Sequence, residues 1–364
     1  MRILRILPIV LLAAGAATFA RADDICPPSD VLASVDMKLG DDGRIYVPVK
    51  LNQVHKSMLL DTGGYFSVVS QETVDQLKLP TRHVRFELID VSGHTTNLVT
   101  HTTFGLGNLY ADSVDFYVSP SEGGFADDVA DAAGILAPNL LRSYDVEIDF
   151  AKMQISLHSQ DHCDGKAVSW PANTVSEVPM TLDSSNHIQI PVNLDGQNLT
   201  SIFDTGATYT VLNLELAQSD FGLKLGDADT PEFGRLLRSP ESKTYFHRFK
   251  SLSMEGMEGT KIANPTVHLI PDLMRNRMMD QNDSLKGGSR LPAVTAKPGF
   301  GDLIIGMNVI RQWHVYIAYR EQKLYLAPSP VVISLAPSKT DDQPAAVQGQ
   351  PTSMAHGAAG KQPH

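Results

Sequence analysis

The stretch IYVPVKLNQVHKSMLLDTGGYFSVVS at residues 45–70 decides the fold, because its pattern returns as IQIPVNLDGQNLTSIFDTGATYTVLN at residues 188–213. The two segments align without a gap at an offset of 143, which places Asp61-Thr62-Gly63 on Asp204-Thr205-Gly206. In each copy an alternating run and a short apolar run precede the triplet, and this order is typical of two strands followed by a turn. The chain therefore carries two copies of one β-rich unit.

A second block is repeated downstream. The segment NLLRSYDVEIDFAKMQISL at 139–157 aligns with NVIRQWHVYIAYREQKLYL at 308–326, at an offset of 169. The larger offset means that the second copy holds 26 additional residues between its two blocks. The surplus fits residues 272–300, which are rich in Met, Gly, Pro and polar residues and lack a sustained apolar period. We expect a surface loop there rather than a third domain.

Short β-type runs dominate the sequence, and helical signals are few. Strands are predicted at 44–51, 57–61, 85–91, 97–104, 113–118, 146–150 and 154–158, and again at 187–194, 200–204, 244–252, 266–270, 314–319 and 323–326. Two helices are predicted, at 71–77 and 214–221, after the capping residues Ser70 and Asn213. We expect lobes at 30–159 and 179–328, a connection at 160–178 and a disordered polar tail at 336–364.

The N-terminal residues 1–22 read as an export signal. Arg2 and Arg5 precede an apolar run at 6–19, and small residues surround a plausible cleavage point. The run is shorter than the roughly 20 apolar residues of a spanning helix, so we expect no stable membrane insertion after cleavage, an uncleaved anchor being the alternative. Cleavage would change the net charge from −11 to −14. An acidic chain without clustered Lys and Arg is a poor nucleic-acid partner, and we expect a periplasmic or secreted protein.

The chain has two cysteines, Cys26 and Cys163. Export would place them in an oxidising compartment, where an even pair usually forms a bridge, so a Cys26–Cys163 disulfide is predicted. The alternative is a metal site built from His158, His162 and Cys163, which lie close together in LHSQDHC. We favour the disulfide because this spacing suits metal ligands only in a helix, and the segment is predicted as a strand leading into a loop.

The repeated aspartates are the candidate catalytic residues. A lone carboxylate at the end of a buried apolar strand is a costly placement, and this chain has two of them, Asp61 and Asp204, at matched positions. If the lobes pack about a pseudo-twofold axis, the two carboxyl groups meet and hold one proton between them. One can then act as general base on a water while the other donates to a carbonyl oxygen, which hydrolyses an amide with no metal or other cofactor.

These motifs resemble those of the aspartic proteases, specifically retropepsin-like domains fused in tandem as in bilobal pepsin-like enzymes, and of the exported bacterial type. In that family each lobe has a hydrophobic-hydrophobic-Asp-Thr-Gly-Ala/Ser turn and, later, a hydrophobic-hydrophobic-Gly segment that packs against it. The resemblance implies a mostly β fold of two homologous barrel-like lobes related by pseudo-twofold symmetry, with the active-site cleft between them. The turn residues are Asp61, Thr62, Gly63 and Gly64 in one lobe and Asp204, Thr205, Gly206 and Ala207 in the other, and the packing segments contain Ile135, Leu136 and Ala137, and Ile304, Ile305 and Gly306.

Two departures from the family pattern lie in the first lobe. Gly64 stands where Ala or Ser is usual, and Ala137 stands where Gly is expected. A methyl group at Ala137 is tolerated if φ is negative but costs stability if φ is positive. We expect an aspartic endopeptidase, monomeric because both lobes share one chain, that acts on a peptide or protein substrate. The alternative is a weakened or inactive relative that binds peptides or serves as a scaffold.

The family also covers its active site with a β-hairpin flap. In the first lobe the candidate is 86–103, with its tip at Ser92, Gly93 and His94, because β-type arms flank a Gly-containing turn. In the second lobe the candidate is 236–249, with its tip at 239–241. Such a hairpin would exclude water and add backbone hydrogen bonds to an extended peptide.

Overall fold

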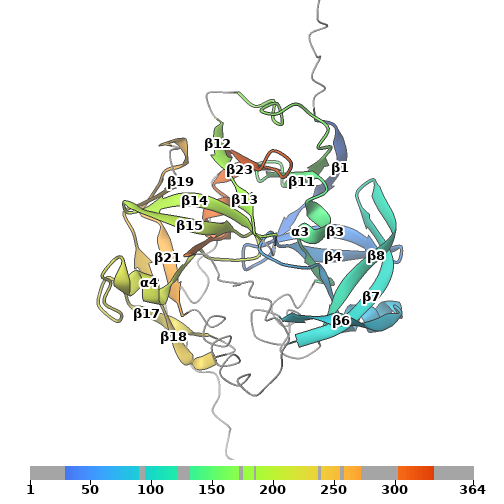
Figure 1. The fold of residues 1–364 in the computed structure, drawn as a ribbon, viewed down its shortest axis with the longest axis horizontal. Coiled ribbons are helices and arrows are strands. Elements are labelled where there is room, and N and C mark those ends of the chain that lie inside the picture. Colours follow the sequence, from blue (N-terminus) through green and yellow to red (C-terminus); the bar gives the residue numbers. More distant parts are fainter. Residues whose placement is uncertain are drawn as a thin grey trace, which may run out of the picture.

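A computed structural model describes residues 29–89, 95–120, 132–171, 175–183, 186–236, 239–254, 258–271 and 302–331. Several predicted features lie outside the described residues: the export signal, Cys26, the flap tip Ser92, Gly93 and His94, the loop 272–300 and the tail 336–364. The described residues form two β-rich lobes joined by a further sheet, which confirms the predicted fold class (Figure 1).

The sheet of the first lobe curls back on itself. Its strands run in the order β2 (Lys38–Leu39), β3 (Ile45–Leu51), β4 (Val54–Leu60), β9 (Gly134–Leu136), β5 (Val68–Ser70), β8 (Leu109–Ser119), β7 (Thr95–Leu106) and β6 (Thr81–Ile89). A further pairing joins β3 to β7, so two strands far apart in this order come together. The alternating burial of β3 follows from this curvature, because one face of the strand meets the barrel interior.

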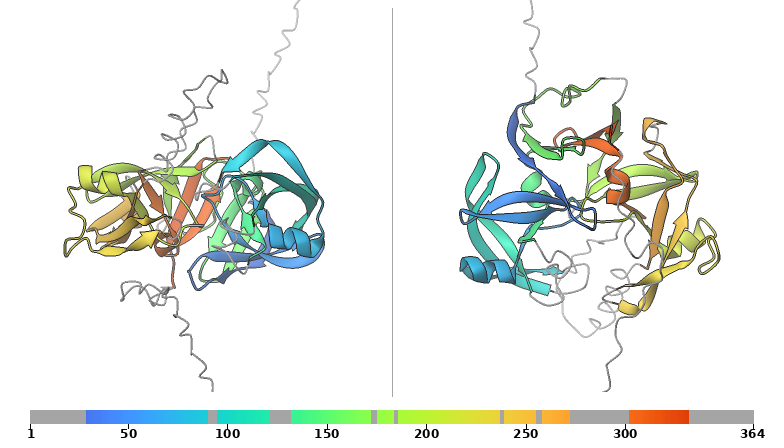
Figure 2. Two further views of the ribbon diagram at one scale, coloured as in Figure 1. Left: turned by 90° about the horizontal axis from the view of Figure 1, so that it is seen from below. Right: turned by 180° about the vertical axis from the view of Figure 1, so that it is seen from behind.

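The second lobe repeats the arrangement. Its strands run in the order β17 (Glu232–Leu236), β18 (Ser239–Arg248), β21 (Thr266–Ile270), β16 (Val211–Asn213), β22 (Leu303–Ile305), β15 (Gln197–Phe203), β14 (Ile188–Leu194), β19 (Ser251–Met254) and β20 (Ile262–Ala263), with β13 (Thr181–Leu182) paired to β14. The two lobes lie side by side, and the third sheet joins them along one side, as the rotated views show (Figure 2).

The joining sheet shows the pseudo-twofold symmetry directly. Its strands run in the order β1 (Val31–Asp36), β11 (Gln154–His158), β10 (Asp145–Asp149), β23 (Trp313–Ala318), β24 (Lys323–Pro328) and β12 (Ser176–Pro179). At its centre β10 of the first lobe pairs antiparallel with β23 of the second, and Glu147 faces Tyr316. These two residues are equivalents in the sequence repeat, at the offset of 169. The symmetry axis therefore passes between Glu147 and Tyr316.

The helices begin where their capping residues predict. Helix α1 (Gln71–Leu77) starts after Ser70, whose hydroxyl accepts the Thr73 N–H, and α4 (Leu214–Ser219) starts after Asn213, whose side chain accepts the Leu216 N–H. Both predicted helices are confirmed, although α4 ends two residues early. The short elements α3 (Pro138–Leu141), α6 (Met307–Ile310) and η2 (Glu258–Thr260) have no sequence prediction, because three or four residues show no helical period.

The single strand predicted at 244–252 is wrong. The structure has two strands there, β18 ending at Arg248 and β19 beginning at Ser251. The Asp195 carboxylate accepts the backbone N–H groups of Lys250 and Ser251 at 2.8 and 2.7 Å, and this contact fixes the bend between the strands. The bend lets β18 pair with β21 while β19 pairs with β14.

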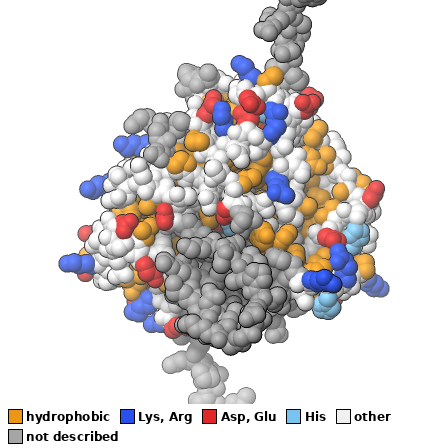
Figure 3. Space-filling model, in the orientation of Figure 1, with side chains coloured by type: hydrophobic (Ala, Val, Ile, Leu, Met, Phe, Trp, Pro, Cys, Tyr) orange, Lys and Arg blue, Asp and Glu red, His pale blue; other side chains and the backbone are white. Residues whose placement is uncertain are grey.

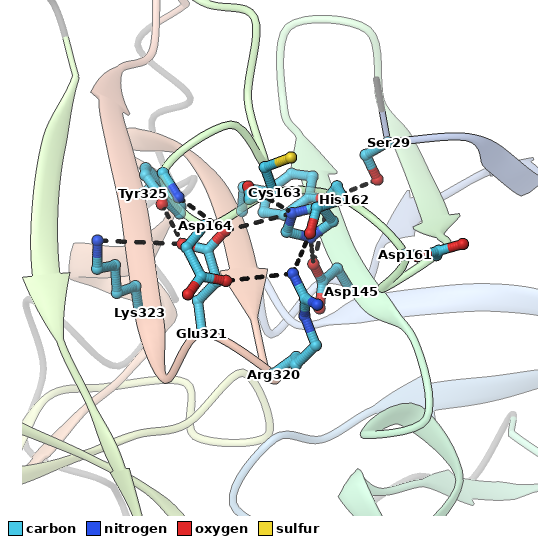
Figure 4. A network of polar contacts seen from close by, with 12 residues as sticks. Ser29, Asp145, Asp161, His162, Cys163, Asp164, Arg320, Glu321, Lys323 and Tyr325 are labelled. Atoms are coloured by element: carbon cyan, nitrogen blue, oxygen red, sulfur yellow. Dashed lines mark hydrogen bonds and ion pairs between the residues drawn. The ribbon is translucent and has the colours of Figure 1, made fainter. Parts of the chain in front are cut away.

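A buried ionic cluster fastens the joining sheet (Figure 4). The His162 side chain is fully buried, with Nε2 2.7 Å from Asp145 Oδ2 of the first lobe and Nδ1 3.3 Å from Glu321 Oε1 of the second. Burial raises the pKa of Asp145, and the hydrogen bond from His162 opposes that effect. The imidazole thus bridges both lobes through carboxylates.

This cluster also excludes the alternative metal site. Cys163 is disulfide-bonded, so its sulfur is not a free thiolate. His158 Nε2 lies 2.9 Å from Glu147 Oε2, whereas His162 pairs with Asp145. The two imidazoles therefore contact different carboxylates and do not converge on a common metal position. The predicted partner Cys26 lies outside the described residues, and the Cys26–Cys163 pairing stays a prediction.

The surface carries charges of both signs. Lys, Arg, Asp and Glu side chains are interspersed on the face shown in Figure 3, in agreement with scattered surface pairs such as Lys243–Glu232 and Lys323–Glu177. Within the part of the chain that the structure describes, no helix has the length and apolar character needed to cross a membrane.

Candidate active site

Two equivalent strand ends position Asp61 and Asp204. Asp61 follows β4, which pairs in parallel with β9, and its N–H donates to the Leu136 carbonyl at 3.0 Å. Asp204 follows β15, which pairs in parallel with β22, and its N–H donates to the Ile305 carbonyl at 3.0 Å. The predicted packing segments, which contain Ile135 in β9 and Ile304 in β22, therefore lie beside the strands that end at the two aspartates and hold the turns in place.

The two turns are cross-linked by Thr62 and Thr205. The Thr62 hydroxyl donates to the Phe203 carbonyl of the other lobe at 2.7 Å and accepts the Thr205 N–H at 3.0 Å. The Thr205 hydroxyl donates to the Leu60 carbonyl at 2.7 Å and accepts the Thr62 N–H at 3.1 Å. Both side chains are fully buried. Because these groups are buried, the four hydrogen bonds fix the distance between the lobes at this point.

Gly63 and Gly206 bring the aspartates together. A Cβ on Gly63 would overlap the carboxylate of Asp204, and a Cβ on Gly206 would overlap that of Asp61. Each glycine also donates its N–H to the aspartate of its own lobe, at 2.9 Å for Gly63 and 2.7 Å for Gly206. The missing side chains are thus a requirement of close approach, since each carboxylate lies over the backbone of the opposite turn.

The electrostatics of the pair favour one shared proton. Burial raises the pKa of Asp61 well above its ordinary value, and the adjacent Asp204 carboxylate raises it further. Burial also raises the pKa of Asp204, while a hydrogen bond from Asp61 and the N–H of Gly206 oppose this rise. The two carboxyl groups therefore hold one proton between them, in the hydrogen bond that joins them.

The unusual residues Gly64 and Ala137 touch each other. A Cβ on Gly64 would lie 3.2 Å from the Ala137 Cβ, which fills the place that a side chain at 64 would need. Ala137 has φ −112°, so its methyl group causes no backbone strain. In the second lobe the methyl belongs to Ala207, and a Cβ on Gly306 would overlap the Tyr209 carbonyl. The two departures from the family pattern therefore compensate each other, and neither introduces a steric conflict.

The sequence interpretation missed a pair of asparagines that brace the turns. Asn139 Oδ1 accepts the N–H of Ser67 at 2.7 Å and its hydroxyl at 2.8 Å, and Asn308 accepts the same two groups of Thr210 at 2.7 and 2.9 Å. The hydroxyl groups in turn accept the N–H of Ala137 and of Gly306. The sequence did hold a signal for this pair, because Asn139 and Asn308 are the first residues of the two copies of the second repeated block.

The two predicted flaps have different outcomes. In the first lobe β6 and β7 form an antiparallel hairpin from Thr81↔Thr100 to Ile89↔Thr95, and the predicted tip lies outside the described residues. In the second lobe the predicted tip at 239–241 is wrong. There β17 pairs with β18, Leu236 faces Ser239, and the connection falls at 237–238. Pro240 suggested a turn, but it lies in the irregular stretch of β18 where the register shifts, which tolerates a missing N–H.

A solved structure and a family model are similar to this chain. The crystal structure of basic 7S globulin from soybean is similar in fold, with a TM-score of 0.48 and 9% sequence identity over 83% of this chain and 98% of that one. No curated protein sequence matches the chain. A family model described as aspartyl protease matches residues 47–139 and 190–309, which is more than half of the chain and includes both aspartate turns. The chain belongs to the aspartyl protease family.

Proposed function

We propose that this protein is an exported aspartic endopeptidase, built from two retropepsin-like units fused in tandem, that hydrolyses peptide bonds of a protein substrate as a monomer. The observation that carries the proposal is the pair of carboxyl groups at Asp61 and Asp204, which come from different lobes and are hydrogen-bonded to each other. Export rests on the sequence of residues 1–22 and on the disulfide at Cys163.

The shared proton gives the two aspartates complementary roles. The ionised member of the pair removes a proton from a water molecule as the water oxygen attacks the scissile carbonyl carbon, and the protonated member donates its proton to the carbonyl oxygen. The resulting diol then collapses: the carboxyl group that took the water proton returns it to the leaving nitrogen, the C–N bond breaks, and one diol hydroxyl returns a proton to the other carboxylate. Both carboxyl groups end in their starting states, so no further cofactor is required.

The test compares Asp61→Asn and Asp204→Asn with a matched control. Each variant keeps the shape of the side chain but cannot exchange a proton, so cleavage of an unfolded protein or a peptide library should fall by roughly a thousandfold or more. Asp195→Asn is the control, because the equivalent position of the first lobe is Asn52 and both residues have φ near 48°, at 47° and 48°. The control should retain wild-type activity.

Two outcomes would contradict the proposal. Undiminished cleavage by either dyad variant would exclude the mechanism. Tight binding of extended peptides by the wild-type protein, with no product at any pH, would instead favour the alternative of a peptide-binding module.

A further inference from the structure

A side chain of the first lobe reaches the aspartate turn of the second. Arg44 directly precedes β3, and its Nη1 donates to the carbonyl of Gly206 at 3.4 Å. Gly206 in turn donates its N–H to the Asp204 carboxylate at 2.7 Å. The Asp61 carboxyl group lies over the same residue, because a Cβ on Gly206 would overlap Asp61 Cγ. The backbone that Arg44 contacts therefore touches both carboxyl groups of the dyad.

A carboxylate of the same loop fixes the direction of the Arg44 side chain. Arg44 Nε lies 2.6 Å from Asp42 Oδ2, and the backbone N–H of Arg44 donates to Asp42 Oδ1 at 2.9 Å. The Tyr46 hydroxyl also donates to Asp42 Oδ2, at 3.2 Å. The Arg44 side chain is 14% exposed, so water competes little for these contacts. One planar guanidinium thus holds Asp42 through Nε and the Gly206 carbonyl through Nη1, which a single ammonium group would not reproduce.

The loop that carries Asp42 is a tight turn. The Gly43 N–H donates to the Gly40 carbonyl at 2.9 Å, and the Gly40 N–H donates to the Arg44 carbonyl at 3.0 Å. A Cβ on Gly40 would lie 2.6 Å from the Tyr46 ring and 2.7 Å from Asp42 Oδ1, so both side chains pack directly on the backbone of the turn. Asp42 is therefore held by the turn itself, and little further ordering is needed to orient the guanidinium.

The second lobe differs at the equivalent position. His187 is the equivalent of Arg44 at the offset of 143, and its Nδ1 lies 3.0 Å from Asp183 Oδ2 of the same lobe. A second arginine of the first lobe also crosses to the other lobe: Arg142 Nη1 donates to Asn186 Oδ1 at 2.6 Å, in the turn between β13 and β14. The first lobe thus sends one arginine to the aspartate turn and another to a hairpin turn.

We propose that Arg44 is a positioning residue of the dyad: held by Asp42, it fixes the Gly206 turn from the opposite lobe and so sets the position of both carboxyl groups. The inference rests on the proposed function and adds to it a group that does not touch the reacting atoms. Because the Asp42 carboxylate balances the charge of Arg44 at 2.6 Å, the role is one of geometry rather than of net charge.

The test compares Arg44→Met and Arg44→Lys, with Arg142→Met as the matched control. Arg44→Met keeps an unbranched stem and loses both contacts, whereas Arg44→Lys keeps the charge but cannot hold Asp42 and the Gly206 carbonyl together. Both should lower kcat by roughly tenfold or more and leave KM little changed, because misplaced reacting groups slow the chemical step. Arg142→Met also removes a hydrogen bond between the lobes, and its kcat should equal that of the wild type.

Asp42→Asn tests whether the carboxylate acts through the arginine. Alone it should lower kcat, because Arg44 loses the partner that orients it. Added to Arg44→Met it should lower kcat no further, since the contact that it would weaken is already absent. Thermal unfolding of each variant checks the fold, and if Arg44→Met does not fold, Arg44→Lys and Asp42→Asn decide the question.

A second measurement needs no turnover and so separates this proposal from the proposed function. Hydrogen exchange of the Gly206 amide, measured by NMR, reports local opening of the turn. It should be faster in both Arg44 variants and unchanged in Arg142→Met. Faster exchange together with an inactive wild type would reject the endopeptidase but support the role of Arg44. Wild-type kcat and exchange in Arg44→Lys would overturn the role of Arg44 alone, and so would an equal loss of kcat in Arg142→Met.

Discussion

The two aspartate turns differ at one contact, and the difference shows what the repeat has preserved. In the first lobe a Cβ on Gly64 would meet the methyl group of Ala137, whereas in the second lobe a Cβ on Gly306 would overlap the backbone carbonyls of Tyr209 and Ala207. Each lobe carries one alanine and one glycine at these two positions, in opposite order. The local backbone therefore decides which position can hold a methyl group, because close-packed interiors leave little room for an added one.

The lobes differ a second time in the charge beside each aspartate. Arg44 carries a permanent charge and donates to the Gly206 carbonyl, whereas its equivalent in the repeat, His187, pairs with Asp183. Hydrogen bonds at the turns are symmetric, with Thr62 and Thr205 making the same contacts. A symmetric set of hydrogen bonds thus holds two aspartates whose neighbouring basic residues differ.

The largest expected effect tests the symmetric part of this comparison. Gly63→Ala and Gly206→Ala each place a methyl group where the opposite carboxylate lies, so the dyad must separate. A displacement of about 1 Å of reacting groups costs roughly a hundredfold, and kcat/KM should fall by at least that factor in both variants. Assays of purified variants with matched thermal unfolding would check this. A large loss in one variant and none in the other would break the symmetry.

A smaller effect concerns the two residues on the symmetry axis, Glu147 and Tyr316. Burial would raise the pKa of Glu147, but hydrogen bonds from His158 and His314 lower it from 4.5 to about 2. A carboxyl group with a depressed pKa in the folded state stabilises the fold above its unfolded pKa, and the contribution disappears as pH falls from about 4.5 to 2. Glu147→Gln should therefore cost about 2 to 3 kcal/mol at pH 5 and little at pH 2.

Urea unfolding at a series of pH values would measure the stability loss of Glu147→Gln. Tyr316→Phe, at the equivalent position across the axis, is the matched variant. Its hydroxyl lies 3.1 Å from the Ser29 hydroxyl and 3.4 Å from Asp145 Oδ2. The pKa of Tyr316 is raised by burial, so it carries no charge in this range, and Tyr316→Phe should change stability equally at both pH values. A pH-independent loss in Glu147→Gln would contradict the ionic role of Glu147.

The smallest expected effect concerns the contact between Gly64 and the methyl group of Ala137. Gly64→Ala adds a second methyl group 3.2 Å from that of Ala137, which should cost about 1 kcal/mol. The double variant Gly64→Ala/Ala137→Gly reproduces the arrangement of the second lobe and should recover most of that loss. A double-mutant cycle by urea unfolding would measure the coupling. Gly306→Ala would place a methyl group on the Tyr209 carbonyl, so it should lower stability more than Gly64→Ala. If the stability changes of the Gly64 and Ala137 substitutions simply add, the two positions do not compensate each other.

Local signals in the sequence predicted a large part of the fold. Ser70 and Asn213 marked the starts of both longer helices, because a cap acts on backbone groups two or three residues away. The single strand predicted over 244–252 failed for the opposite reason. The bend after Arg248 is held by Asp195, a residue more than fifty positions earlier, and no pattern within the segment reports it.

The sequence by itself determined that there are two related units and that an aspartate follows a buried strand in each, because repeats and periodicity are written in neighbouring residues. Only the tertiary structure decided that the Asp204 carboxylate leaves no room for a Cβ on Gly63, that Gly64 lies against the methyl group of Ala137, and that Thr62 and Thr205 exchange hydrogen bonds between the lobes. These contacts join residues that are brought together by strand pairing and by the pseudo-twofold axis. Their chemistry therefore exists only after the two lobes have packed.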